Sequence, residues 1–157
     1  MTELYLLRHA DAGNPDRWVG DDGERPLSGK GLRQARRLAA LLKSLDWRPD
    51  AIVTSPKRRA AETAEAVAKE LGVPARVDGR LASAFGRPEL AELIAAENGA
   101  DRLLLVGHDP DFSDLASELV GAAIALRKGS LIRIDLDDEG TAGVVRWLLP
   151  PDVVPSR

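Results

Sequence analysis

The chain has 157 residues, of which 44% are hydrophobic and 30% are charged, a composition typical of one soluble globular domain. Its net charge of -3 predicts no general affinity for nucleic acid or anionic membranes, and no apolar run approaches the roughly 20 residues of a membrane span. The sequence has no cysteine, which excludes disulfides, thiolate zinc sites and a cysteine nucleophile. Residues 3–7 are typical of a strand rather than a signal peptide, so we expect a cytoplasmic protein.

Three short apolar segments, each followed at once by polar residues, predict buried strands. They are residues 3–7, 51–54 and 103–106. Strands that are apolar on both faces occur in parallel sheets that helices cover on both sides.

Helical periodicity fills the intervals between these strands. Residues 29–45 carry apolar side chains along one face and basic side chains largely off it, with Ser28 as the expected N-cap. Residues 57–71 repeat this pattern. There we expect Ser55 as the N-cap and Pro56 at the first helical position.

Further helices and a terminal hairpin complete the predicted elements. We expect short helices at residues 88–97 and 111–120. The alternation of residues 130–136, followed by a turn signal and an apolar segment at 143–149, predicts a hairpin at the sheet edge. Residues 11–27, rich in Gly, Asp and Pro, form one long loop, and such a length in a compact domain indicates function.

The order of strands and helices predicts the fold class α/β, as a three-layer α/β/α sandwich with a mostly parallel central sheet. We expect a single domain over residues 1–149. The Pro-rich tail over residues 150–157 is expected to lack regular structure.

Both histidines of the sequence stand at the end of a predicted strand. His9 follows the first strand, directly after Arg8, and His108 follows the third. Ligands of open parallel sheets bind at the carboxyl ends of the strands, so we expect the two imidazoles to lie together. The segment after the second strand brings Arg59 to the same edge.

Two imidazoles and two guanidinium groups at one edge favour phosphoryl transfer. Arginine binds phosphate oxygens in pairs, and a neutral imidazole can attack phosphorus to form a covalent phosphohistidine. The arginines are expected to disfavour the imidazolium and keep His9 neutral. Asp11 or Asp109 is a candidate to orient one imidazole. Arg58 is interpreted as surface charge and Thr63 as a packing residue.

These residues resemble the signatures of the histidine phosphatase superfamily, the phosphoglycerate-mutase-like proteins. The family's strand ending in Arg-His-Gly corresponds to Leu6-Leu7-Arg8-His9-Ala10, and its Ser-Pro-x-x-Arg-Ala-x-x-Thr-Ala signature corresponds to residues 55–64. Gly107-His108 matches a third signature, and residues 25–35 resemble the opening of the family's first long helix. The resemblance runs from about residue 3 to about residue 120, in the family's order.

The resemblance implies roles for four residues. His9 is the phosphorylated nucleophile, Arg8 and Arg59 are phosphate ligands, and His108 completes the pocket. It implies no metal ion and no cofactor.

Two departures from the family pattern bear on the substrate. Ala10 replaces the usual glycine, as in the short phosphohistidine phosphatase (SixA-like) branch. Ser83 stands where many members carry a proton-donating glutamate, and Glu89 and Glu92 are interpreted as surface residues of the next helix. Ser83 and Asp109 are further candidates for substrate contact.

The missing acid favours a phosphoramidate substrate. An alkoxide leaving group needs a positioned acid, whereas imidazole, whose conjugate acid has a pKa of roughly 6.5, does not demand the same help. We therefore expect hydrolysis of phosphohistidine on another protein, and neither nucleic acid nor membrane as a partner.

Three alternatives remain open from the sequence. The first is a phosphomonoesterase acting on small esters such as sugar phosphates or nucleotides. The second is a metallohydrolase with His9, Asp11, His108 and Asp109 as ligands, although the adjacent arginines would oppose cation binding. The third is a catalytically silent module that binds phosphate.

Overall fold

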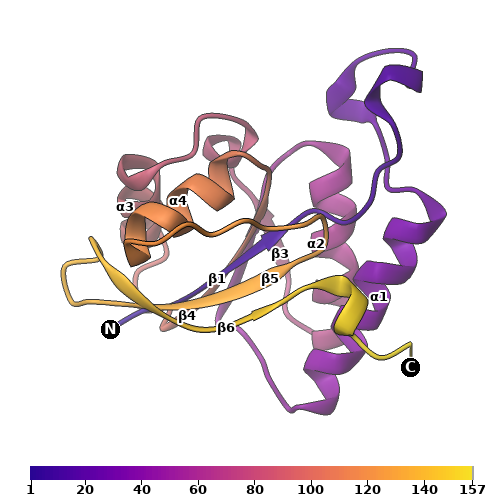
Figure 1. Ribbon diagram of the computed structural model, residues 1–157. Helices are drawn as coiled ribbons and strands as arrows, with labels where there is room; N and C mark the ends of the chain where they lie inside the picture. Colours follow the sequence, from indigo (N-terminus) through magenta and orange to yellow (C-terminus); the bar gives the residue numbers. More distant parts are fainter. Residues whose placement is uncertain (157) are drawn as a thin grey trace.

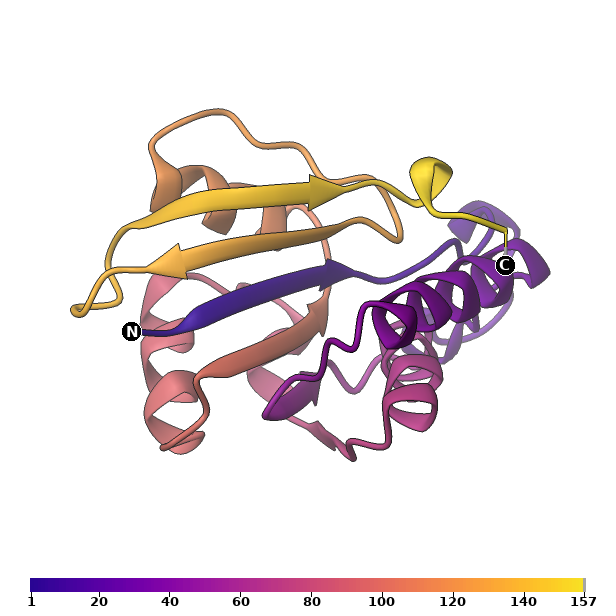
Figure 2. The ribbon, with the colours of Figure 1, turned by 90° about the horizontal axis from the view of Figure 1, so that it is seen from below.

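A six-stranded sheet with the order β3-β2-β4-β1-β5-β6 runs through the computed structural model, which describes residues 1–156. The four strands from β3 to β1 are parallel, whereas β5 runs antiparallel to β1 and β6 antiparallel to β5. Figure 2 shows β4, β1, β5 and β6 side by side. The strands are β1 (Glu3–Arg8), β2 (Ala51–Thr54), β3 (Ala75–Val77), β4 (Arg102–Gly107), β5 (Leu131–Leu136) and β6 (Gly143–Leu149).

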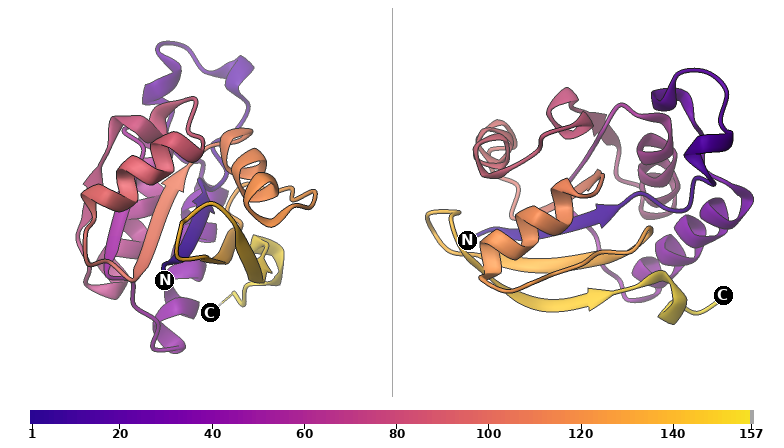
Figure 3. Two further views of the ribbon diagram at one scale, coloured as in Figure 1. Left: turned by 90° about the vertical axis from the view of Figure 1, so that its left-hand side faces the viewer. Right: turned by 45° about the horizontal axis from the view of Figure 1, so that its top comes forward.

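Helices cover both faces of this sheet. They are α1 (Gly29–Ser44), α2 (Arg58–Leu71), α3 (Arg87–Ala96) and α4 (Asp111–Val120). Successive side chains of β1 alternate between the two layers: Leu4 and Leu6 pack in the cluster with α3 and α4, and Tyr5 and Leu7 pack in the cluster with α1 and α2. Figures 1 and 3 show these two helical layers. The predicted three-layer α/β sandwich is confirmed.

The strand register places the site-bearing segments at one edge of the sheet. Arg8 at the end of β1 pairs with Gly107 at the end of β4, so that His9 and His108 leave the sheet at the same level. Thr54 at the end of β2 pairs with Val106. The loop over residues 11–27, which contains two 3-10 turns, projects beyond this edge (Figure 1).

The structure confirms Ser28 as the N-cap of α1, since its Oγ accepts a hydrogen bond from the amide of Gly31. The expected cap of α2 is wrong. This helix begins at Arg58 with Lys57 as N-cap, and the Ser55 hydroxyl accepts a hydrogen bond from the Lys57 amide within the preceding turn. The hydroxyl of Ser55 acts only as an acceptor in this bond, so its hydrogen remains available for a second partner.

Strand β3 was not predicted from the sequence. It has only three residues, two of them exposed, and therefore lacks the run of buried apolar residues that marks the other parallel strands. In the tail, residues Pro151–Val153 form one 3-10 turn; residue 157 lies outside the described residues. Within residues 1–156, no helix combines the length and the apolar character that a membrane crossing requires.

Gly31 allows the loop after β1 to lie directly against α1. A Cβ at this position would overlap the carbonyl oxygen of Asp11 and lie 2.8 Å from its carbonyl carbon. We expect Gly31→Ala to lower the free energy of unfolding by about 1–3 kcal/mol, measured by urea denaturation. Gly29→Ala is the matched control in the same helix turn, since its Cβ meets only the flexible end of Arg33 at 3.5 Å. Equal stability of the two variants would contradict this account.

Candidate active site

The residues singled out in the sequence converge on a pocket of about 360 Å³ at the carboxyl edge of the parallel strands. The imidazole rings of His9 and His108 lie with their centroids 5.3 Å apart and their planes at 55°. The predicted pairing of the two histidines is confirmed. Residues that line the pocket include Arg8, His9, Arg25, Lys57, Arg59, Ser83, His108, Asp109, Asp111 and Lys128.

A backbone carbonyl fixes the tautomer of His9. Its Nδ1 lies 2.7 Å from the carbonyl oxygen of Ala10. Because a carbonyl oxygen only accepts hydrogen bonds, Nδ1 carries the proton and Nε2 of the neutral ring keeps its lone pair. The Ala10 segment is held in turn by Thr63, whose Oγ1 accepts the Ala10 amide hydrogen at 3.1 Å and donates to the Arg59 carbonyl at 2.7 Å. Thr63 is buried in α2 and does not line the pocket, in agreement with the predicted packing role, and its hydroxyl also holds the Ala10 segment.

His108 is held by the turn that follows β2. Its Nε2 lies 2.7 Å from Ser55 Oγ, and its buried Nδ1 has no hydrogen-bond partner within the described residues. When the Ser55 hydroxyl donates to Nε2, the neutral ring carries its proton on Nδ1 and can offer it to an anion. Glycine precedes His108 because the ring of Phe112 packs against this backbone; a Cβ on Gly107 would lie 2.6 Å from that ring.

Burial and nearby positive charge hold the pKa of both imidazoles well below 7. Burial, followed by the charges of Arg59 and Arg8, lowers the pKa of His9 to about 4, against the opposing effect of its hydrogen bond to Ala10. Burial also lowers the pKa of His108 to about 3, with His9 and Arg59 adding to the shift. This low pKa agrees with the predicted neutrality of His9, although burial rather than the arginines is its main cause.

Two guanidinium groups, those of Arg8 and Arg59, border the pocket, and each has an N–H donor without a partner among the described residues. Arg8 donates to the Leu126 carbonyl at 2.7 Å, and the nearly buried Arg59 donates to the Asp22 carbonyl at 2.8 Å and to its carboxylate at 3.0 Å. Among residues 1–156, Nε of Arg8 and Nε of Arg59 are buried without a partner. Such donors match the oxygens of a phosphoryl group.

Arg25 is a further pocket cation that the sequence reasoning did not single out. It is buried, donates from Nη1 to the Ala12 carbonyl at 2.7 Å, and pairs through Nε with Asp22 at 3.0 Å. The hydrogen bond from Arg25, together with the charge of Arg59, holds the pKa of Asp22 below its usual value. The sequence feature that could have indicated this role is the position of Arg25, which lies in a Gly- and Asp-rich loop three residues before the N-cap Ser28.

The weaker candidates have distinct positions. Ser83 is exposed and lines the pocket. Asp109 also lines it, but its carboxylate accepts hydrogen bonds from the Ser113 amide and hydroxyl at 3.0 and 2.6 Å. Arg58 pairs with Glu62 on the surface, as predicted.

The expectation that Asp11 or Asp109 orients an imidazole is wrong. The partners of the two rings are the Ala10 carbonyl and the Ser55 hydroxyl. Asp11 instead accepts a hydrogen bond from Ser28 Oγ at 2.6 Å. In the described part of the chain, no three His, Asp or Glu side chains lie close enough together to hold a metal ion, although His9, His108 and Asp109 line the same pocket.

The depressed pKa values predict an unusual titration. Because the folded-state pKa lies below the usual 6.5 for both rings, neither should protonate between pH 8 and pH 5.5, and protonation should begin only near pH 5 and below. We expect the imidazole C–H resonances in proton NMR to stay constant across that window. The His9→Gln and His108→Gln variants assign the two sets of signals. A midpoint between pH 6 and 7 for either ring would contradict the burial argument.

Comparison with known proteins identifies the family. The sequence model of the histidine phosphatase superfamily (branch 1) matches residues 4–92. An uncharacterized protein of Picosynechococcus is 34% identical, covering 94% of this chain and 99% of that protein. Phosphohistidine phosphatase SixA of Escherichia coli is 27% identical, covering 95% of this chain and 94% of its own. The structure of SixA complexed with tungstate superposes with a TM-score of 0.86 at 26% identity, covering 98% of this chain and 100% of that chain. The chain therefore belongs to the histidine phosphatase superfamily, branch 1, and is a phosphatase.

Proposed function

We propose that this phosphatase transfers the phosphoryl group of its substrate to Nε2 of His9 and then to water, with Arg8, Arg59 and His108 as phosphate ligands. The hydrogen bond between His9 Nδ1 and the Ala10 carbonyl carries this proposal. It leaves the opposite ring nitrogen unprotonated, in a pocket bordered by cationic and neutral donors.

In the first step, the Nε2 lone pair attacks phosphorus while the bond to the leaving group breaks. The transferring phosphoryl group spreads negative charge over its three remaining oxygens. Arg8 Nε and Arg59 Nε are buried donors without partners in residues 1–156, and they can stabilise this charge without reorganising. Phosphorylation makes the ring cationic, and the Ala10 carbonyl then accepts a stronger hydrogen bond from Nδ1–H.

In the second step, water attacks phosphorus and His9 leaves as a neutral imidazole. The water oxygen becomes the fourth oxygen of inorganic phosphate, which is released, and one proton of that water passes to the solvent. The low pKa of His9, about 4, favours this departure, because the leaving ring needs no proton on Nε2.

The substrate class that fits this site is phosphohistidine on a protein. The glutamates beyond Ser83 do not supply an acid: Glu89 caps α3 by accepting the Gly86 amide at 2.9 Å, and Glu92 pairs with Arg80 at 3.7 Å. The two aspartates that line the pocket are engaged as acceptors, Asp109 by Ser113 and Asp111 by the Phe85 amide. An imidazole leaving group tolerates this arrangement better than an alkoxide does. The likeness to SixA, named a phosphohistidine phosphatase, supports the same substrate class.

Trapping the intermediate tests the chemistry. Brief exposure to a ³²P-labelled phosphoramidate in excess chelator, followed by quenching, should leave an acid-labile, alkali-stable label on the protein. The His9→Ala variant should lose label and turnover together, because Nε2 of the other imidazole, His108, is engaged by the Ser55 hydroxyl. Arg58→Ala is the matched control: this surface arginine adjoins Arg59 in sequence and pairs with Glu62, so label and turnover should persist. Label retained by the His9→Ala variant, or formed only after metal is added, would contradict the mechanism.

Substrate comparison tests the class. We expect kcat/KM for a phosphohistidine peptide to exceed that for alkyl phosphate esters by a factor of at least about 10², the usual contribution of a positioned general acid. An aryl phosphate, whose leaving group is more acidic, should fall between the two. A preference for sugar phosphates or nucleotides would favour the phosphomonoesterase alternative, whereas phosphate binding without any turnover would favour a silent module.

A further inference from the structure

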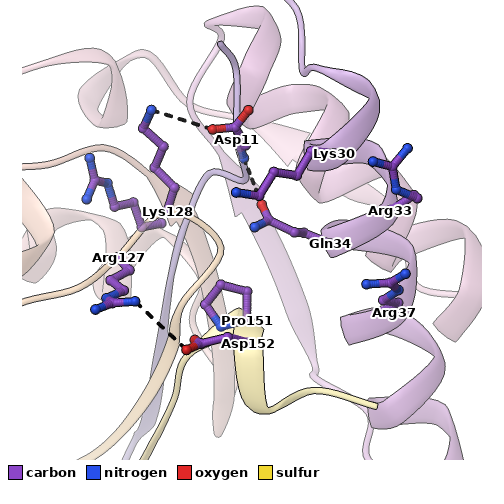
Figure 4. A pocket seen from close by; sticks show the side chains of 10 residues that line it. Asp11, Lys30, Arg33, Gln34, Arg37, Arg127, Lys128, Pro151 and Asp152 are labelled. Carbon is purple, nitrogen blue, oxygen red and sulfur yellow. Dashed lines mark hydrogen bonds and ion pairs between the residues drawn. The ribbon is translucent and has the colours of Figure 1, made fainter. Parts of the chain in front are cut away.

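A second, larger cavity lies beside the proposed active site. It has a volume of about 710 Å³ and is lined by six basic side chains, two carboxylates, Gln34 and Pro151. We call it the basic groove. Figure 4 shows its two sides, with side chains of α1 on one and the loop before β5 on the other. The lining residues are Arg8, Asp11, Lys30, Arg33, Gln34, Arg37, Arg127, Lys128, Pro151 and Asp152.

The basic groove is continuous with the pocket that holds His9. Arg8 and Lys128 line both cavities. A substrate that places a phosphoryl group at His9 therefore extends past these two residues, and the rest of it can reach the groove.

The positive charge of the groove is only partly neutralised by carboxylates, of which Asp109 lies 3.6 Å from Arg8. Within residues 1–156, the α1 cations Lys30, Arg33 and Arg37 form no ion pair. The loop cations face carboxylates only at long distances, with Arg127 3.8 Å from Asp152 and Lys128 3.7 Å from Asp11. These pairs are partly or largely exposed, and such pairs contribute little to stability. An overall acidic protein thus concentrates available cations beside its active site.

The helix geometry arranges these cations in a row. Lys30, Arg33 and Arg37 follow the i, i+3, i+7 spacing of one helix face and span roughly 10 Å along α1. Basic residues on a single helix are commonly only a solvated face. Here Arg127 and Lys128, contributed by a segment far away in sequence, stand opposite that face and turn it into a groove (Figure 4).

We propose that the basic groove binds acidic side chains of the substrate polypeptide and thereby selects phosphohistidines that lie in acidic surroundings. This inference rests on the proposed function, namely that the substrate is protein phosphohistidine. Four of the six cations stand on long, exposed side chains, and Arg8 and Lys128 are partly buried where the groove joins the active-site pocket. That arrangement suits several carboxylates distributed over a polypeptide better than one small anion. Complementary charge of this kind raises association rates and specificity.

Two phosphohistidine peptides test the proposal. They are identical except that one carries two glutamates on each side of the phosphohistidine and the other carries glutamines. We expect the wild-type enzyme to hydrolyse the acidic peptide with a kcat/KM about tenfold higher at low ionic strength, through KM rather than kcat, with the preference declining as salt screens the charges.

Paired variants of α1 supply the control. Arg33→Ala/Arg37→Ala removes two groove cations, whereas Arg36→Ala/Lys43→Ala removes two cations from the same helix outside the groove; Arg36 lines a different cavity and Lys43 pairs with Glu70. Alanine favours the helix in all four positions. The groove variant should lose most of the preference for the acidic peptide, and the control variant should keep it. The control variant should hydrolyse the glutamine peptide like the wild type, and the groove variant should lose much less kcat/KM on the glutamine peptide than on the acidic one.

The outcomes separate the two proposals. Hydrolysis of both peptides by the wild type with equal kcat/KM overturns the groove proposal and leaves the proposed function standing. A preference that the control variant loses as much as the groove variant also overturns it, because overall charge then explains the effect. The wild type could instead hydrolyse alkyl or aryl phosphates and neither peptide. That result overturns the proposed substrate class, and the groove proposal falls with it.

Discussion

The hydrogen bond from His9 Nδ1 to the Ala10 carbonyl decides which nitrogen of the ring is nucleophilic, and the proposed chemistry depends on it. A backbone carbonyl cannot take up a proton and cannot change its role, so the tautomer is set by the path of the chain itself. That path is secured by Thr63, which bonds the Ala10 amide, and by Gly31, which lets the following segment rest on α1. Residues of α1 and α2 therefore support the chemistry without touching the substrate.

Burial is the second constraint on the pair of histidines. Each histidine residue is 6% exposed, and desolvation is the largest cause of the low pKa of both rings. An acidic partner, as in many catalytic histidines, would raise the pKa and favour the imidazolium. The neutral partners observed here, a carbonyl and a hydroxyl, orient the rings without raising their pKa as a carboxylate would. The parallel register that aligns Arg8 with Gly107 then brings both neutral rings to one level of the sheet edge.

Features with local sequence patterns were predictable, and features made by long-range contacts were not. Short apolar segments and helical periodicity predicted the three layers of the α/β/α sandwich. The positions of His9 and His108 at strand ends predicted that the two rings lie together. The tautomer of His9 has no sequence signature because its partner is a backbone atom. The role of Arg25 depends on how the loop over residues 11–27 folds back toward Arg59. The basic groove likewise depends on the fold, because Arg127 and Lys128 line it together with side chains of α1.

The loop over residues 11–27 supplies the counter-charge that a cationic pocket requires. An unpaired guanidinium as buried as that of Arg59 would be costly, and Asp22 offsets this cost by bonding both Arg59 and Arg25. The Asp22 side chain is itself 55% exposed, so its ion pairs are weak in water and are readily exchanged. A phosphoryl dianion carries more charge than one carboxylate and can bind the Nε donor of Arg59, which Asp22 leaves without a partner in residues 1–156. The loop thus keeps the arginines ionised and positioned, yet holds them loosely enough for phosphate to bind.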